Sequence, residues 1–337
     1  MLNWAIAGTS YISTIIAERI AESADSQCIS VFGRDALRTT EFATRFGIGS
    51  ATTKFATVLD DPSIDIVYVG LPNHVHYEYS ELALKHGKAV LCEKSLTTKL
   101  DEAQLLFEAA NRSGRFFIEG FAYRHHPLMA TLQTVLLEHR IGKLKYLHAS
   151  YAADIVKFAN PLGGGTIFNL GCYPVSLLQV IVQTVYGPGA FAQGHVTGSG
   201  SSEIDGVLTE AALTIRYDEG LIASIYSSDS YGLRSDLSIH GELGTIVFKT
   251  NPWLPEAGVS RMEIQFHDGR TEVVEIESEL DSFGHQVRSI ERSIQAREIV
   301  PIKPAPSIHD SLEIMQVLTA WHTACDRDIA VLRPSLL

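Results

Sequence analysis

The sequence is poor in cysteine, and its cysteines are widely scattered. Its 337 residues include four of them, Cys28, Cys92, Cys172 and Cys325, with no Cys-x-x-Cys pair. Zinc sites commonly use closely spaced cysteine pairs, and small secreted domains use dense disulfide frameworks. We therefore expect neither a metal site nor a disulfide framework, and we expect a reducing, cytoplasmic location.

Basic side chains, long apolar runs and a signal sequence are also lacking. The chain has 27 Lys and Arg against 39 Asp and Glu, a formal net charge of −12, and no Lys/Arg block. Such a charge argues against nucleic acid or an anionic membrane as a partner. No apolar run approaches the roughly 20 residues that span a bilayer. Residues Met1–Trp4 lack the basic region that opens a signal peptide, so we do not expect secretion.

Short apolar runs alternate with helical patterns over residues 1–120. Strands are predicted at Asn3–Ala7, Cys28–Phe32, Ile64–Gly70, Ala89–Cys92 and Phe116–Glu119, and helices at Tyr11–Ala24, Asp35–Phe46, His76–His86 and Lys99–Arg112. Strands that are apolar throughout and alternate with helices indicate a parallel sheet that is buried on both faces.

The pattern changes after residue 125, where runs rich in Val, Ile, Thr and Tyr dominate. Strands are predicted at Leu147–Ala153, Leu208–Tyr217, Leu221–Ser227, Leu237–His240 and Thr245–Lys249, and helices at Pro127–His139, Cys172–Tyr186, Ser282–Arg297 and Ser311–Asp326. Turn residues between these strands indicate a largely antiparallel sheet. The predicted fold class is therefore α/β, with one domain at residues 1–120 and a second, α+β domain at residues 121–337.

The first βα turn, Gly8-Thr9-Ser10-Tyr11-Ile12-Ser13, holds a partial glycine motif. Turns that bind dinucleotides commonly read G-x-G-x-x-G/A between a strand and a helix. Gly8 fits the first position. Ser10 stands in place of the second glycine, and Ser13 stands in place of the final glycine or alanine. The motif is compatible with an ordinary turn, yet its place at the start of the alternating pattern favours a phosphate site at the helix N-terminus.

The second predicted strand ends in a basic rather than an acidic residue. Val31-Phe32-Gly33 is followed by Arg34 and Asp35. An acid at this strand end commonly holds the ribose diol of NAD, whereas an arginine can meet the 2′-phosphate of NADP. We therefore expect NADP, with NAD possible. A solvated charge is the alternative for Arg34, and Asp35 is explained as a helix N-cap.

A lysine follows the fourth predicted strand, in the segment Cys92-Glu93-Lys94-Ser95. The carboxyl ends of parallel strands face the crevice in which such folds bind ligands. Lys94 would there hold a substrate hydroxyl, although a lone lysine is more often only solvated.

Five motifs, taken in order along the chain, carry a resemblance to a known family. They are Trp4-Ala5-Ile6-Ala7-Gly8-Thr9, Gly70-Leu71-Pro72-Asn73-His74-Val75-His76-Tyr77-Glu78, Ala83-Leu84-Lys85-His86-Gly87-Lys88-Ala89-Val90-Leu91-Cys92-Glu93-Lys94, Glu119-Gly120-Phe121-Ala122-Tyr123-Arg124-His125-His126-Pro127 and Gly163-Gly164-Gly165-Thr166-Ile167-Phe168-Asn169-Leu170-Gly171-Cys172-Tyr173-Pro174. Residues 1–180 are thereby similar to the glucose–fructose oxidoreductase / inositol dehydrogenase / rhizopine catabolism (Gfo/Idh/MocA) family.

The resemblance implies a dinucleotide-binding Rossmann domain at residues 1–120 and a substrate-binding and dimerisation domain at residues 121–337. It implies a nicotinamide cofactor and a sugar-like, cyclic polyol or dihydrodiol substrate. Lys94 and Tyr173 match catalytic positions, and Asn169, Tyr123 and Arg124 are expected substrate contacts, with a buried arginine as the alternative for Arg124. The expected cofactor contacts are Gly8, Thr9, Ser10, Tyr11, Ile12, Arg34, Leu71, Pro72, Asn73, His76, Glu93 and Lys94.

Three positions depart from the family pattern: Ser10, Ser95 and Asn169 stand where glycine, proline and aspartate are usual. Asn169 can bond a hydroxyl but carries no charge, so Tyr173 and Lys94 would manage the proton. A phenol with a pKa of about 10 is a weak base at neutral pH. The charge of Lys94 and the dipole of the helix that starts at Cys172 are expected to stabilise the phenolate. We expect a trans Lys94–Ser95 bond, because a cis peptide bond costs much more free energy before serine than before proline.

The expected function is hydride transfer between NAD(P) and an alcohol or carbonyl group. The alternative is a non-catalytic, nucleotide-sensing regulator of the same fold, which would need neither Lys94 nor Tyr173. Because Leu213, Ile215, Leu221 and Ile225 are expected on both sides of their strands, an uncovered apolar sheet predicts a homodimer through its open face. Trp253, in a loop flanked by prolines, is expected to be a substrate lid or a dimer contact.

Overall fold

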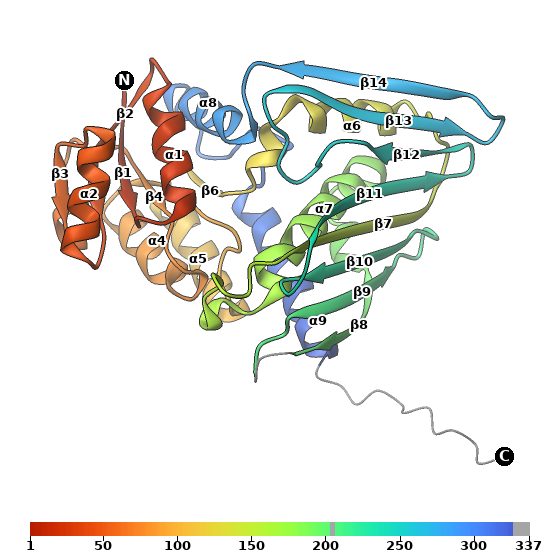
Figure 1. The fold of residues 1–337 in the computed structure, drawn as a ribbon, viewed down its shortest axis with the longest axis horizontal. Coiled ribbons are helices and arrows are strands. Elements are labelled where there is room, and N and C mark those ends of the chain that lie inside the picture. The colour runs from red at the N-terminus through yellow and green to blue at the C-terminus, as the bar shows by residue number, and fades with distance from the viewer. Residues whose placement is uncertain (203–205, 326–337) are drawn as a thin grey trace, which may run out of the picture.

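The computed structural model describes residues 1–202 and 206–325 of the chain, which form two sheets with their covering helices (Figure 1). The sheet of the N-terminal part has six strands, and that of the C-terminal part has eight. The observed architecture confirms the predicted α/β class and the predicted change of pattern between the two parts.

The six-stranded sheet is parallel, with the order β3-β2-β1-β4-β5-β6. Its strands are β1 (Leu2–Ala7), β2 (Ser26–Phe32), β3 (Ser50–Thr52), β4 (Ile66–Val69), β5 (Ala89–Cys92) and β6 (Phe117–Glu119), and its helices are α1 (Tyr11–Ala21), α2 (Ala36–Phe46), α3 (Phe55–Leu59), α4 (His76–Lys85) and α5 (Leu100–Ser113). Alternate residues of β1 enter two different hydrophobic clusters, one on each face of the sheet. This two-sided burial explains why these strands are apolar throughout.

The eight-stranded sheet has the order β14-β13-β12-β11-β7-β10-β9-β8, and only the β7–β10 pair is parallel. The strands are β7 (Leu144–Ala153), β8 (His195–Ser201), β9 (Glu210–Arg216), β10 (Ile222–Ser228), β11 (Leu233–Gly241), β12 (Gly244–Phe248), β13 (Gly258–Phe266) and β14 (Thr271–Ser278). The helices are α6 (Pro127–Leu137), α7 (Cys172–Tyr186), α8 (Ser282–Gln295) and α9 (Ile308–Cys325), with short helical turns at η1 (Asn73–Val75), η2 (Ala122–His125), η3 (Pro161–Gly163), η4 (Ile167–Gly171) and η5 (Phe191–Gln193).

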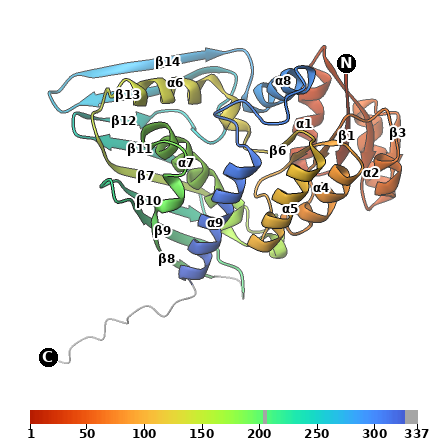
Figure 2. The same cartoon turned by 180° about the vertical axis from the view of Figure 1, so that it is seen from behind.

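Helices cover one face of the eight-stranded sheet and leave the other face open. Helices α6, α7 and α9 lie behind the strands in Figure 1 and in front of them in Figure 2. Leu213, Ile215, Leu221 and Ile225 are all buried in the core on the helical side, so the expectation that they occupy both faces is wrong. Residues two apart in a strand point to the same face of the sheet. Leu213 and Ile215 are two apart, so both point to the helical side.

The open face carries mainly polar side chains. Across its centre, Ser224 of β10 pairs with Thr214 of β9 and with His148 of β7, which in turn pairs with Ser238 of β11. These four side chains are half-buried or exposed. The strands are thus ordinary amphipathic strands, with one apolar and one polar face.

The turn η4 and helix α7 together form one apolar helical segment, Ile167–Tyr186. Its 20 residues have a mean hydropathy of 1.3, which is high enough to cross a membrane by length and composition. The segment was not predicted as one apolar run. The segment is mostly buried inside the protein, between the sheet and α9, and therefore serves as a core helix.

Several elements were not predicted from the sequence, namely β3, α3, β8, β13 and β14. Strand β8 reads HVTGSGS and β14 reads TEVVEIES, so each has few apolar residues or alternates them with acids. Both lie at the edges of the eight-stranded sheet. Edge strands need less apolar burial, and that makes their sequence signal weak.

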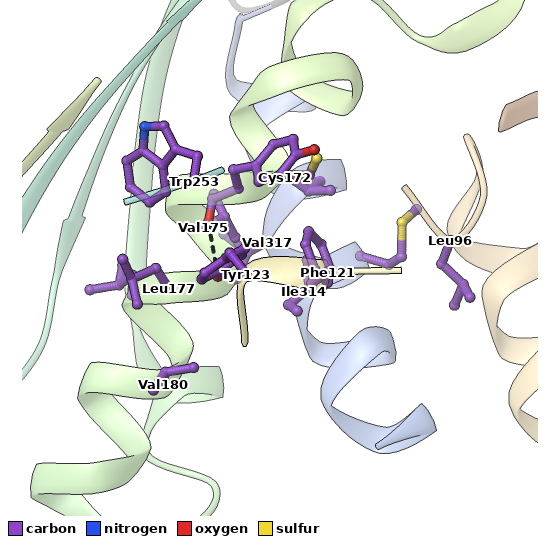
Figure 3. Packing of buried hydrophobic residues seen from close by; sticks show 14 of the residues in the cluster. Leu96, Phe121, Tyr123, Cys172, Val175, Leu177, Val180, Trp253, Ile314 and Val317 are labelled. Atoms are coloured by element: carbon purple, nitrogen blue, oxygen red, sulfur yellow. Dashed lines mark hydrogen bonds between the residues drawn. The ribbon is translucent and has the colours of Figure 1, made fainter. Parts of the chain in front are cut away.

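The C-terminal helices pack back on the N-terminal part. Helix α8 contacts α1 and η2, and α9 contacts α5 and α7. The chain that leaves β6 passes between α7 and α9, where Phe121 and Tyr123 are buried (Figure 3). The two parts therefore share one continuous core.

Arg124 fixes this junction from inside. Its side chain is 1% exposed; Nε donates to the carbonyl of Pro304 at 2.6 Å and Nη1 donates to Oε1 of Gln179 at 3.1 Å. Gln179 donates in turn to Oε2 of Glu313 at 2.8 Å. Burial lowers the pKa of Arg124, but the nearby carboxylates of Asp310 and Glu119 favour its charge. Arg124 therefore joins η2, α7 and the segment before α9.

This placement predicts that Arg124 contributes to stability. Replacing Arg124 with Met leaves buried acceptors without a donor, so we expect a loss of about 3–5 kcal/mol in the free energy of unfolding. Urea denaturation measures this loss. Arg112→Ala, at an exposed site on α5, is the control and should change the value by less than about 0.5 kcal/mol. Unchanged stability in Arg124→Met together with a raised KM would instead support the predicted substrate contact.

Candidate active site

Two close backbone approaches form the floor of a crevice at the carboxyl ends of β1 and β4. The amide of Gly8 donates to the carbonyl of Phe32 at 2.8 Å, and the amide of Gly70 donates to that of Ala7 at 2.9 Å. Gly8 has a φ of +117°, and a Cβ there would lie 2.5 Å from the oxygen of Gly70. Only glycine fits this position. The crevice lies where the strand order reverses, which is where doubly wound sheets bind ligands.

Ser10 stands at the helix start above this floor. It is the N-cap of α1: its Oγ accepts from the amide of Ser13 at 3.3 Å and donates to the carbonyl of Gly70 at 3.3 Å. The amides of Tyr11 and Ile12, in the first helical turn, point out of the helix and have no acceptor within it. A glycine turn with free amides at a helix N-terminus fits the diphosphate of a dinucleotide.

Arg34 lies beside this turn, just past the end of β2. Its side chain is exposed and forms no ion pair with any residue that the structure describes. Asp35 accepts from the amide of Arg38 at 3.0 Å and caps α2, as predicted. Thr9 lies under the same edge, close to the backbone of Gly33. Arg34 is thus the charged group free to meet a nucleotide phosphate at this edge.

A cleft of about 360 Å³ opens between the turn and the start of α7. Its walls include nine of the residues predicted for the site: Ser10, Ile12, Leu71, Pro72, Asn73, Glu93, Lys94, Asn169 and Tyr173. These residues come from both parts of the chain and are up to 163 positions apart in sequence, counted from Ser10 to Tyr173. The structure brings together the glycine turn and the predicted catalytic pair.

Lys94 reaches across the cleft from β5 to the start of α7. Its Nζ donates to the backbone oxygen of Asn169 at 2.7 Å and lies 4.9 Å from the centre of the Tyr173 ring. The expectation of a trans Lys94–Ser95 bond is wrong, because the bond is cis. Ser95 is held on both sides: its Oγ donates to Phe168 at 2.8 Å, and its carbonyl lies 2.9 Å from Nδ1 of His76.

His76 and Glu93 support the cleft from beneath. His76 is fully buried, and its ring nitrogens lie 2.9 Å from the carbonyl of Ser95 and 2.7 Å from that of Leu71. Burial lowers the pKa of His76 to about 4. The neutral ring has a single N–H, so it donates a hydrogen bond to only one of these two carbonyls. The carboxyl of Glu93 accepts from the hydroxyl of Tyr68 at 3.0 Å, and burial raises its pKa. His76 does not line the cleft, whereas Glu93 does.

Tyr173 lies in an aromatic cluster in the first turn of α7. Its ring centre is 6.1 Å from those of Phe121 and Tyr123 and 5.3 Å from that of Tyr151. Burial raises the pKa of Tyr173 well above its usual value, and the nearby carboxyl of Glu93 acts in the same direction. This direction opposes the expected stabilisation of the phenolate by Lys94 and the helix dipole, because the cost of desolvating the anion is larger. The proton role of Tyr173 stays a prediction.

Tyr123, Arg124 and Trp253 do not line the cleft. Tyr123 is fully buried, and its hydroxyl lies 2.5 Å from Oγ of Ser176. Arg124 is occupied at the junction described above. Trp253 is buried as well, donates to the carbonyl of Ser150 at 3.3 Å and stacks on Tyr151. Trp253 is therefore a core residue, neither a lid nor an exposed dimer contact.

Five residues of the site were not predicted, and one of them is Gly70, just after β4, which lines the cleft. Phe158, Asn160 and Gly163 line the cleft from the segment after β7, and Asn73 donates to the carbonyl of Gly163 at 3.3 Å. Asp229, just past β10, accepts from Nδ2 of Asn169 at 2.7 Å. The glycine run that begins at Gly163 was a usable signal, but nothing local marks Phe158, Asn160 or Asp229.

The described part of the chain holds no group of three or more His, Cys, Asp or Glu side chains that is suited to a metal ion. His125 and His126 are adjacent, and Nδ1 of His126 caps α6 by accepting from the amide of Leu128 at 3.2 Å. The predicted absence of a metal stays a prediction.

Named relatives have related activities. Scyllo-inositol 2-dehydrogenase (NADP(+)) of Bacillus subtilis is 30% identical over 284 residues, covering 82% of this chain and 83% of that protein. D-xylose 1-dehydrogenase (NADP(+)) 2 of Haloferax volcanii is 25% identical over 97% of this chain and 98% of its own. Trans-1,2-dihydrobenzene-1,2-diol dehydrogenase of Xenopus tropicalis is 26% identical over 75% and 76%.

Solved structures share the fold. A 3-ketoreductase from Actinomadura kijaniata in complex with NADP and TDP-benzene superposes with a TM-score of 0.84 at 22% identity, over 96% of this chain and 97% of that one. Levoglucosan dehydrogenase in complex with NADH and levoglucosan gives a TM-score of 0.80 at 18% identity, with the same coverage.

Family models match most of the chain. Residues 2–121 match the model described as oxidoreductase family, NAD-binding Rossmann fold, and residues 129–247 match the GFO/IDH/MocA C-terminal domain. The predicted resemblance is confirmed, and the chain belongs to the Gfo/Idh/MocA family of NAD(P)-dependent oxidoreductases.

Proposed function

We propose that the protein transfers a hydride between NADP(H) and a hydroxyl-bearing carbon or its carbonyl in a sugar-like, cyclic polyol or dihydrodiol compound. The observation that carries this proposal is the meeting of Lys94, Tyr173 and Asn169 in one cleft beside the glycine turn. Relatives that act on an inositol, a pentose and a dihydrodiol support the same substrate class.

The cofactor fits the residues that line its expected path. The backbone at Gly8 and Gly70 leaves no room for a Cβ, and the first turn of α1 offers free amides to a diphosphate. Leu71, Pro72 and Asn73 would flank the nicotinamide end, and Arg34 the adenosine end. When bound, the nicotinamide supplies or accepts the hydride, which is the chemistry that the protein itself lacks.

The side chains of the cleft would handle the proton. In carbonyl reduction, the neutral phenol of Tyr173 donates its proton to the carbonyl oxygen as the carbon gains the hydride. The ammonium of Lys94 stabilises the negative charge that develops on that oxygen and on the phenolate left behind. In alcohol oxidation the same proton moves back to Tyr173, which must first be deprotonated.

A non-catalytic regulator was the alternative function. The named relatives are dehydrogenases and a ketoreductase, and this supports an enzyme. A regulator that only senses nucleotide needs neither the Lys94–Asn169 bond nor a tyrosine beneath the ammonium, yet both are present.

The proton role of Tyr173 predicts a large loss of turnover on removal of its hydroxyl. Tyr173→Phe should lower kcat by about 10²–10⁴-fold and leave NADP binding intact, and Lys94→Ala should nearly abolish turnover.

The raised pKa of Tyr173 predicts a pH dependence in the unchanged protein. Alcohol oxidation should accelerate as the pH rises toward this pKa, because the phenolate is the base. Reduction should fall only above that pKa, because the phenol is the acid.

The measurement is the absorbance of reduced nicotinamide across pH, with trans-1,2-dihydrobenzene-1,2-diol, D-xylose and scyllo-inositol as substrates. Tyr186→Phe, at the other end of α7, serves as the matched control. Normal turnover in Tyr173→Phe would transfer the proton role to another residue.

The position of Arg34 predicts a preference for NADP(H) over NAD(H). One arginine–phosphate contact is worth about 1.5–3 kcal/mol, so Arg34→Ala should weaken NADP(H) binding by about 10–100-fold and leave NAD(H) unchanged. Fluorescence titration with both cofactors measures this. Arg45→Ala, on the last turn of α2, is the control. An unchanged preference in Arg34→Ala would rule out this contact.

We further propose a homodimer that forms through the open face of the eight-stranded sheet. No element of the described chain covers this face (Figures 1 and 2), and Tyr146 pairs with the exposed Ile222 on it. Light scattering should give about twice 36.9 kDa, and Ile222→Lys should yield monomers. A single-chain mass for the unchanged protein would exclude this dimer.

The cytoplasmic location stays a prediction.

A further inference from the structure

A carboxylate that has no part in the chemistry above lies directly behind the cleft. Asp229 follows the last residue of β10 and is 2% exposed. Its Oδ2 accepts from Nδ2 of Asn169 at 2.7 Å. Asn169 is the cleft residue whose backbone oxygen holds the ammonium of Lys94. A buried charge is costly unless its partners compensate for it, so its position next to this asparagine calls for an explanation.

The bond to Asp229 fixes which end of the Asn169 amide faces the cleft. An ionised carboxylate only accepts hydrogen bonds, so the amide nitrogen must point to it. The amide oxygen then lies on the opposite side, where a Cβ on Gly163 of the cleft wall would be 3.4 Å from it. If Asp229 were absent or neutral, the amide could turn over and present its N–H groups to the cleft.

The ammonium of Lys94 is the positive charge that favours the ionised form of Asp229. Burial raises the pKa of Asp229, whereas the hydrogen bond from Asn169 and the charge of Lys94 act in the opposite direction. Its second carboxyl oxygen, Oδ1, is buried and has no hydrogen-bond partner among the residues that the structure describes. On the neighbouring strand, the carboxylate of Glu210 is bound instead to Ser201 and Ser230. When ionised, Asp229 places a negative charge behind Asn169 that matches the ammonium in front of it.

The backbone of Asp229 also holds the second wall of the cleft. Its carbonyl accepts from the amides of Ile155 at 2.9 Å and Val156 at 3.0 Å. These residues start the segment that brings Phe158 and Asn160 to the cleft. One residue thus fixes both the amide of Asn169 and the start of the segment opposite it.

We propose that Asp229 is a positioning residue that holds the Asn169 amide oxygen toward the cleft, where it accepts a hydrogen bond from a substrate hydroxyl beside the reacting carbon. This proposal rests on the proposed function. It narrows the substrate class to compounds with a hydroxyl next to the reacting carbon, which is the group that can donate to this oxygen.

The test exchanges the two side chains. Asp229→Asn lets either amide turn over, so we expect KM for the three compounds above to rise about tenfold or more, with kcat within about threefold and NADP affinity unchanged. The double variant Asp229→Asn/Asn169→Asp restores a carboxylate–amide pair of the same size, and KM should recover most of the loss. Asp154→Asn, at an exposed aspartate on the segment after β7, removes the same charge and should behave like the unchanged protein.

A second readout does not depend on turnover. In protein labelled with [¹⁵N]asparagine, the side-chain amide proton of Asn169 that binds a carboxylate should appear at low field and move upfield in Asp229→Asn, with no such change in Asp154→Asn. Absence of this shift overturns the proposal, as does an unchanged KM in Asp229→Asn or a double variant that recovers nothing. A lack of turnover with all three compounds in the unchanged protein would count against the proposed function, and the amide resonance would still decide the orientation of Asn169.

Discussion

The contact of the Lys94 ammonium with the start of α7 is the interaction on which the site depends. Lys94 lies two residues after β5 of the N-terminal sheet, whereas the Asn169 carbonyl and the Tyr173 ring belong to the C-terminal part. An ammonium needs hydrogen-bond acceptors and a negative or polarisable surface, and here both come from the other part of the chain. The reactive groups therefore meet only when the two parts pack against each other.

The packing that creates this contact also sets the proton chemistry. The aromatic cluster of Phe121, Tyr123 and Tyr151 surrounds the Tyr173 ring, which is 9% exposed. In such surroundings the neutral phenol is favoured over the anion, and a single ammonium over the ring does not reverse the preference. These surroundings are consistent with the proposed role of the Tyr173 phenol as the proton donor in carbonyl reduction.

Several residues that the sequence placed in the site instead hold it in shape. Arg124 joins three segments at the junction, and the buried His76 ring lies between the carbonyls that follow β4 and β5. Tyr123 packs beside the Tyr173 ring. Each of them lies next to a cleft residue in sequence or in space, so a motif that spans the site includes them without showing which side chains face the ligand.

The sequence by itself determined the alternating strands and helices and the glycine turn at Gly8, because these features depend on local periodicity or on short motifs. Short motifs also singled out Lys94 and Tyr173 as candidate catalytic residues. Only the tertiary structure decided that Asp229 lies behind Asn169, that Phe158 faces the cleft and that the open sheet face is polar. Asp229 and Asn169 are separated by 60 positions, and each reads locally as an ordinary polar residue. Their meeting depends on how β10 and the π-helical turn η4 pack together, and a contact between segments so far apart leaves no local pattern in the chain.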